Sequence, residues 1–226
     1  MWSPRDPVFA TWDRNTIELT AANAAGHYSL AGSAPAFKRD GTFTHVRNGE
    51  VLEWTSDCGK AAETLSPPVP LGADPFGPYC PQRVIARSEL VRPLPRGARL
   101  RSVEALAWLD DSRFMAVLAT RERAWVAAYE GGRALRASPY ATGADITRAD
   151  PTGSYVAILA RGTVEAYDRD TGIPWGSPLE AVAYDWSPVG DWLAYSTGAS
   201  IYLVRTSDWT TQFRLPLSTV SLAWRQ

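Results

Sequence analysis

The stretch AVAYDWSPVGDWLAYSTGASIYLVRTSDWTTQFRLPLS, residues 181–218, decides the fold class. Apolar and polar residues alternate along four short runs, and turn-forming residues separate the runs. The runs are AVAYDW, DWLAYS, IYLVRT and TTQFRLPL, with SPVG, TGAS and SDW at the turns. Alternation with a period of two residues between tight turns is typical of short antiparallel strands. This stretch therefore predicts one four-stranded antiparallel sheet.

The same frame recurs upstream, beginning near residues 34, 102 and 143, and the opening of the chain fits it without a first strand. The first residues of the repeated turn are Ser3, Lys38, Asp110, Asp150 and Ser187, at spacings of 35, 72, 40 and 37 residues. Three of the four spacings lie within the ~35–45 residues of a propeller blade. The repeat therefore predicts five blades.

The C-terminal segment supplies a match for the missing first strand. VSLAW at residues 220–224 resembles VEALAW at residues 103–108, which begins another unit. A C-terminal strand beside the N-terminal hairpin closes a ring and removes open sheet edges. We predict an all-β fold over residues 1–226, a single five-bladed β-propeller domain of four-stranded antiparallel blades. Residues 219–224 are expected to complete its first blade.

Two segments carry a resemblance to a known family. WSPVGDWLAY at residues 186–195 and FKRDG at residues 37–41 resemble the W/F-S-P-D-G-x-x-L-A-Y/F core of TolB-like and WD-repeat β-propellers. The likeness covers most of the chain apart from residues 66–101. It implies the propeller fold, and the resemblance to TolB-like propellers implies protein partners.

Composition excludes several classes of protein. The chain has 226 residues, of which 45% are hydrophobic and 21% charged, with a formal net charge of −1; this favours a packed core over disorder. Its pI of about 6.1 disfavours nucleic-acid binding, and no apolar run approaches the ~18–20 residues of a membrane span. The opening MWSP lacks a signal-peptide pattern. We expect no nucleic-acid partner, no membrane insertion by this chain itself, and a monomeric domain of a larger protein.

Residues 66–101 interrupt the repeat and are rich in proline, which disfavours regular sheet. We predict an insertion in the second blade; a sixth, degenerate blade is the alternative, because the long spacing is about twice a blade. Within it, QRVIA at residues 82–86 predicts a short strand. SELVR at residues 88–92 predicts one helical turn, capped by Ser88 and ended by Pro93.

The only two cysteines, Cys58 and Cys80, border this insertion. A disulfide between them closes a loop of this length with a stabilisation of ~3 kcal/mol in the chain-entropy model; a pair of free thiols is the alternative. Because disulfides persist in oxidising compartments, we expect a bacterial extracytoplasmic domain, periplasmic or at the cell surface. Its membrane anchor would lie outside this sequence.

Chemical motifs are sparse. The chain holds no G-x-S-x-G elbow, phosphate loop or dinucleotide fingerprint. His27 and His45 are expected at the surface, and with the two cysteines they give no zinc spacing. The strand tryptophans, among them Trp12, are expected to fill the space between blades. We expect no metal and no cofactor.

Paired carboxylates are the remaining catalytic candidates, because glycosidases use two of them. The predicted inner strands carry Glu104, Asp145 and Asp185. Aligned on their turns, the three fall at different strand positions and need not converge. Isolated polar residues lining a wet channel are the simpler interpretation.

Arginines occupy the turns between the second and third strands of the predicted blades. They are Arg14, Arg47, Arg121, Arg123 and Arg161. Equivalent turns of successive blades gather on one face of a propeller, whereas Asp110, Asp168 and Asp208 fall on the opposite face. Arginine suits contact with carboxylate and phosphate groups, and a rim of one sign steers partners. These five arginines are the candidate binding residues; exposed arginines without a joint role are the alternative.

The sequence thus predicts a non-enzymatic binding, sensor or scaffold domain that recognises a protein or an anionic cell-envelope ligand through one propeller face. A rigid ring with variable loops is a recognition platform, although a fold alone does not fix function. The alternative is a glycan-active or glycan-binding five-bladed propeller, a glycoside hydrolase or a lectin.

Overall fold

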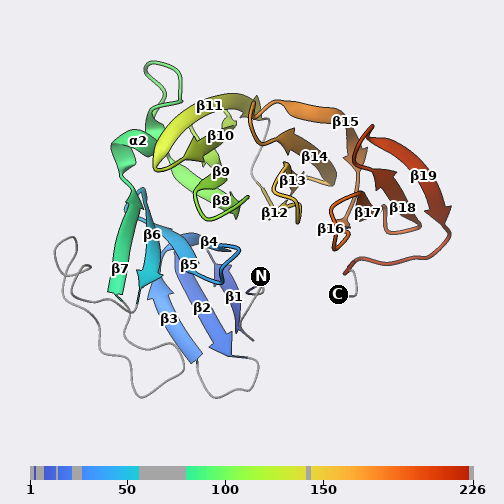
Figure 1. Ribbon diagram of the computed structural model, residues 1–226, viewed down its shortest axis with the longest axis horizontal. Helices are drawn as coiled ribbons and strands as arrows, with labels where there is room; N and C mark the ends of the chain where they lie inside the picture. The colour runs from blue at the N-terminus through green and yellow to red at the C-terminus, as the bar shows by residue number, and fades with distance from the viewer. Residues whose placement is uncertain are drawn as a thin grey trace.

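The structure is a computed structural model of the chain, and it describes residues 3, 8–13, 15–21, 27–55, 80–140 and 144–223. The described strands form five antiparallel sheets, each built from strands that are consecutive in the sequence. The sheets follow one another around a common centre, with β4, β8, β12 and β16 on the inner side and β7, β11, β15 and β19 on the outer side (Figure 1). This is the arrangement of propeller blades.

The first sheet holds three strands, β1 (Val8–Asp13), β2 (Thr16–Ala21) and β3 (His27–Ala31). The second holds β4 (Ser33–Phe37), β5 (Phe43–Arg47), β6 (Glu50–Thr55) and β7 (Cys80–Ile85). The third holds β8 (Ser102–Trp108), β9 (Arg113–Ala119), β10 (Ala124–Glu130) and β11 (Arg133–Tyr140). The fourth holds β12 (Ile146–Ala149), β13 (Tyr155–Ala160), β14 (Thr163–Asp168) and β15 (Pro174–Glu180). The fifth holds β16 (Ala183–Trp186), β17 (Trp192–Ser196), β18 (Ile201–Arg205) and β19 (Thr210–Leu215), and the helix α2 (Arg87–Val91) links the second sheet to the third.

The core lies between neighbouring sheets. Strand residues alternate between two faces, so each sheet offers apolar side chains to the sheet before it and the sheet after it. Buried aromatic residues near the ends of inner strands join the sheets by hydrogen bonds. The indole N–H of Trp108 on β8 donates to Thr44 Oγ1 on β5 at 2.7 Å, and that of Trp186 on β16 donates to the Arg148 carbonyl on β12 at 3.2 Å.

The repeated turn after each inner strand has a local cause. In the fourth sheet, the Asp150 carboxylate accepts the backbone N–H groups of Thr152 and Tyr155 at 2.9 and 2.6 Å. In the fifth, Ser187 Oγ accepts the N–H of Trp192 at 3.1 Å. Gly190 occupies a φ of 77°, which favours glycine. An acceptor at the first position and a glycine at the fourth therefore produce the spacing seen in the sequence.

The closing strand predicted for residues 219–224 is not seen in the described part of the chain. The first sheet has three strands there, and residues 216–223 contain no strand. This segment is held on its own fifth sheet, because Ser196 Oγ donates to the Thr219 carbonyl at 2.5 Å and Ser218 Oγ to the Gly198 carbonyl at 2.6 Å. In Figure 1 the arc of sheets remains open between the first and the fifth. Trp224 lies outside the described residues.

The proposed insertion at residues 66–101 needs correction. Its part at residues 80–85 is β7, which pairs with β6 as the outer strand of the second sheet, and no sixth sheet forms among residues 80–101. The helical turn predicted at residues 88–92 is confirmed as α2, but the predicted cap is wrong. Ala86 is the N-cap and makes no side-chain cap bond, because Ser88 lies within the helix. None of the helical residues that the structure describes forms a segment of the length and hydropathy that crossing a membrane requires.

Cys80 begins β7 and is buried. Cys58 lies outside the described residues, so the Cys58–Cys80 pairing stays a prediction.

Candidate binding face and channel mouth

The predicted arginines occupy equivalent turns. Arg47 ends β5, Arg121 and Arg123 lie between β9 and β10, and Arg161 lies between β13 and β14; all four are exposed. Arg14 lies outside the described residues. Because equivalent turns of successive blades share one side of a propeller, we call the side that carries these four residues the arginine face.

The local backbone favours projecting these side chains. Asn48 and Gly49 have φ values of 55° and 78°, and Arg161 and Gly162 have 49° and 77°. Two consecutive residues with positive φ form the tight hairpin turn that matches the twist of antiparallel strands. The backbone N–H of Arg161 also donates to Asp145 Oδ2 at 3.2 Å, which fixes this turn against the start of β12, the inner strand of the same sheet.

Ion pairing differs between the two faces. On the opposite face, four basic side chains pair with carboxylates: Lys38 with Glu53, Arg113 with Asp110, Arg169 with Asp170 and Arg205 with Asp208. The exposed Arg39 and Arg133 of that face form no such pair among the described residues. Nor, within the same residues, does any of Arg47, Arg121, Arg123 and Arg161; Arg123 instead lies 6.0 Å from the centre of the Trp125 ring. The arginine face therefore presents four unpaired guanidinium groups, with Glu122 and Glu180 exposed beside them.

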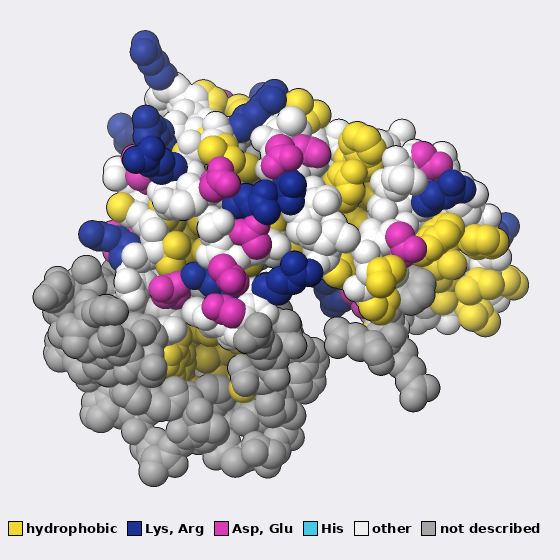
Figure 2. Space-filling model, in the orientation of Figure 1, with side chains coloured by type: hydrophobic (Ala, Val, Ile, Leu, Met, Phe, Trp, Pro, Cys, Tyr) yellow, Lys and Arg dark blue, Asp and Glu magenta, His cyan; other side chains and the backbone are white. Residues whose placement is uncertain are grey.

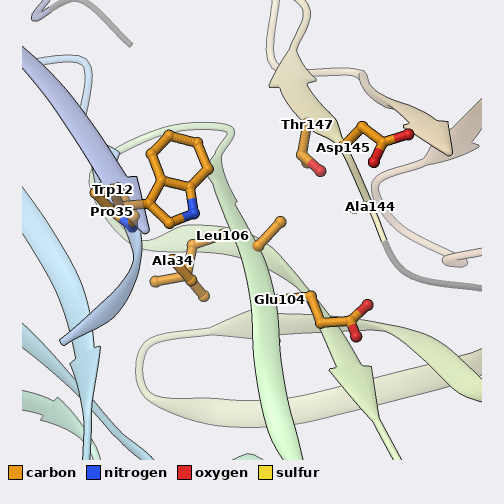
Figure 3. A pocket seen from close by; sticks show the side chains of 9 residues that line it. Trp12, Ala34, Pro35, Glu104, Leu106, Ala144, Asp145 and Thr147 are labelled. Atoms are coloured by element: carbon orange, nitrogen blue, oxygen red, sulfur yellow. The ribbon is translucent and has the colours of Figure 1, made fainter. Parts of the chain in front are cut away.

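A small pocket lies near the centre of the arc (Figure 3). Its volume is about 10 Å³, and it is lined by Trp12, Ala34, Pro35, Glu104, Ala105, Leu106, Ala144, Asp145 and Thr147. It lies where β1 ends and where β8 and β12 begin. These strand ends lie on the side of the arginine face, on the inner side of the arc of sheets, and we call this pocket the channel mouth.

Two polar atoms in the channel mouth lack partners within the described residues. Glu104 Oε2 and Thr147 Oγ1 are both buried and make no hydrogen bond there, and Thr147 is only 7% exposed. Burial raises the pKa of Glu104, while a hydrogen bond from the backbone of Ala144 and the charge of Arg101 act in the opposite direction. Since most buried polar atoms are hydrogen-bonded, this pair marks a site that can accept donors.

The inner-strand carboxylates are distributed over two places. Glu104 and Asp145 line the same pocket, with both carboxylates directed away from Trp12 in Figure 3, whereas Asp185 pairs with Arg148. The expectation that Trp12 belongs to the core is wrong: it is 39% exposed and forms one wall of the channel mouth, across from Thr147 and Glu104 in Figure 3.

The two histidines differ from each other. His45 was expected at the surface but is fully buried, and burial, assisted by the charge of Arg47, lowers its pKa to about 4. His27 is exposed, and its Nε2 lies 2.9 Å from Glu18 Oε2. Among the described residues, no cluster of three or more His, Cys, Asp or Glu side chains is placed to hold a metal ion.

Five antiparallel sheets around a common centre define the β-propeller class. One solved structure with a similar chain course is the crystal structure of the tricorn protease, at 14% sequence identity and a TM-score of 0.46. The match covers 87% of this chain and 20% of that chain, so this chain spans about a fifth of that protein's length. Neither a protein-family model nor a curated protein sequence matches this chain. Membership of the TolB-like or WD-repeat families stays a prediction.

Proposed function

We propose that this chain is a non-enzymatic recognition domain that binds an acidic protein partner or an anionic cell-envelope component through the arginine face. The observation that carries the proposal is the contrast in ion pairing. Arg47, Arg121, Arg123 and Arg161 are exposed without a carboxylate partner among the described residues, while four basic residues of the opposite face are paired with carboxylates.

The chemistry of arginine supports an anionic partner. A guanidinium presents five donors in a planar fork that matches carboxylate and phosphate groups, and it stays charged at any physiological pH. Three turns of one rigid scaffold hold such groups at fixed relative positions. Because the scaffold is rigid, it loses little conformational entropy when a partner binds to these arginines. Their combined electrostatic field increases the rate of association with acidic partners.

A charge-reversal experiment tests this proposal. The double variant Arg47→Glu/Arg161→Glu is compared with Arg133→Glu/Arg136→Glu, which makes the same charge change at exposed residues of the third sheet's outer strand. Binding of a fluorescein-labelled oligoglutamate is followed by anisotropy at low ionic strength. We expect the first variant to lose affinity by about tenfold or more, since contacts to charged groups contribute about 1.5–3 kcal/mol each. Equal loss in both variants would contradict a role for this face.

The compartment we propose is extracytoplasmic. The predicted disulfide between Cys58 and Cys80 supports an oxidising environment, where such bonds persist. Mass spectrometry of peptides from the unreduced protein should recover Cys58 linked to Cys80. Recovery of both as free thiols would remove this support.

We also propose that residues 219–224 close the ring in solution. The outward face of the fifth sheet is apolar: Phe213 and Leu215 are 56% and 44% exposed, and Trp192 contacts Phe213 at a centroid distance of 5.8 Å. Figure 2 shows hydrophobic side chains gathered at the right-hand end of the molecule, over β18 and β19. Such a face is normally covered in a soluble protein. Deleting residues 220–226 should then lower Tm strongly relative to deletion of residues 225–226, and equal Tm values would contradict closure.

The channel mouth supports non-catalytic binding over glycoside hydrolysis. Glu104 and Asp145 line one pocket, as a hydrolase needs, but its volume is about 10 Å³. In Figure 3 both carboxylates also point away from Trp12, whereas a glycosidase holds a sugar ring between its carboxylates with room for a nucleophile. An assay with chromogenic glycosides should therefore give no turnover.

A further inference from the structure

The channel mouth has an unusual set of acceptors. Glu104 Oε2 and Thr147 Oγ1 are buried without partners among the described residues, and the exposed carboxylate of Asp145 joins them on the same pocket wall. Leaving such atoms unsatisfied costs free energy that a donating ligand recovers. The Glu104 carboxylate accepts, and the Thr147 hydroxyl can accept as well as donate, so a donating ligand can satisfy both atoms.

The opposite wall adds a second preference. Trp12 presents its ring to the pocket across from Glu104 and Thr147 (Figure 3). In that view the ring turns its edge toward these residues and the Glu104 carboxylate points away from it, so the indole supplies an apolar wall. The carboxylate of Glu104 favours a cationic donor over a neutral one, because hydrogen bonds between ionised groups are stronger.

The size of the pocket further restricts which chemical groups can enter it. The pocket of about 10 Å³ admits one water-sized group. An ammonium head meets this limit and carries three donors with no acceptor.

The pocket also adjoins the arginine face directly. Asp145 lines the channel mouth and accepts the backbone N–H of Arg161 through Oδ2. An acidic residue close to a bound ammonium group would therefore lie near the Arg161 turn. We propose that the channel mouth binds the side-chain ammonium of a lysine within an acidic peptide segment of the partner protein, whose flanking carboxylates contact the arginine face; this rests on the proposed function.

Peptide binding tests the inference. The probes are two short glutamate peptides, capped at both ends, with either lysine or norleucine at the centre. We expect wild-type protein to bind the lysine peptide about tenfold more tightly, and Glu104→Gln to abolish this preference while leaving norleucine-peptide affinity unchanged. Glu180→Gln is the matched control, because Glu180 is exposed at the end of β15 on the same face, and it should keep the preference. Equal affinity of wild type for both peptides would overturn the subsite while leaving the arginine face intact.

A second probe isolates the subsite from the arginine face. n-Butylammonium is titrated into the ¹⁵N-labelled protein, and the backbone amides of Ala144 and Thr147 are followed by NMR. We expect saturable shifts in wild type and in Arg47→Glu/Arg161→Glu, and their loss in Glu104→Gln and Thr147→Val. If these amides do not respond, or respond equally to glucose, the ammonium subsite is wrong even where the oligoglutamate probe binds.

Discussion

Replacement of Thr44 by valine should weaken the contact between the second and third sheets. Thr44 is fully buried; its hydroxyl accepts the indole N–H of Trp108 at 2.7 Å and donates to the Ala36 carbonyl at 3.1 Å. Valine has almost the same shape, so Thr44→Val removes both hydrogen bonds without opening a cavity. The buried indole N–H then has no acceptor.

The size of the effect follows from this geometry. An unsatisfied buried donor costs about 1–3 kcal/mol, and each kcal/mol lowers the Tm of a chain of this size by about 2–4 °C. At the middle of the range we expect a Tm lower by about 4–8 °C. Near-ultraviolet circular dichroism should change as well, because the Trp108 ring loses its fixed partner.

Thermal unfolding followed by circular dichroism measures this difference. The control is Thr211→Val, since Thr211 is an exposed strand residue of β19 and its replacement should move Tm by less than about 2 °C. A Thr44→Val protein as stable as wild type would refute the assignment of Trp108 to the contact between these sheets. It would also contradict the distance at which the second and third sheets pack against each other.

Three further predictions concern the core and the cysteines. Gly32→Ala should destabilise the protein, because a Cβ there would lie 2.7 Å from His45 Cδ2 and 3.0 Å from the Val46 carbonyl oxygen; unchanged Tm would refute this packing. Since the pKa of His45 is lowered to about 4 and the unfolded value is about 6.5, stability should fall as pH drops from 6.5 to 4, and should fall less in His45→Leu. Reductant should lower Tm in wild type but not in Cys80→Ser, as scanning calorimetry would show.

Much of the fold could be predicted from local pattern. Four repeated units place their turns at Lys38, Asp110, Asp150 and Ser187, and each turn follows an inner strand in the structure. These turns are predictable because their causes lie within a few residues of each other: an acceptor side chain at Asp110, Asp150 and Ser187, and a glycine with positive φ at Gly41, Gly153 and Gly190. The outer strand β7 was recognisable only in part, since its partner β6 is separated from it by the residues of the predicted insertion.

The channel mouth was less predictable because it depends on contacts between distant segments. Trp12, Glu104 and Asp145 belong to three different parts of the arc of sheets. The sequence of a single repeat does not show how far neighbouring inner strands are shifted along each other. His45 illustrates the same limit. Its strand carries buried residues on both faces, and its burial depends on the space left by Gly32 across the strand pair. The arginine turns needed only the repeat itself, so their positions followed from the sequence.

Mapping the contact surface of an acidic peptide tests the central claim most directly. Lysine-free oligoglutamate is titrated into ¹⁵N-labelled protein, and backbone amide shifts are recorded at both ends of the strands. The account predicts saturable shifts confined to the turns around Arg47, Arg121 and Arg161, with none at the turns around Asp110 and Asp150. Shifts centred on the Asp110 and Asp150 turns, or spread equally over both faces, would contradict it.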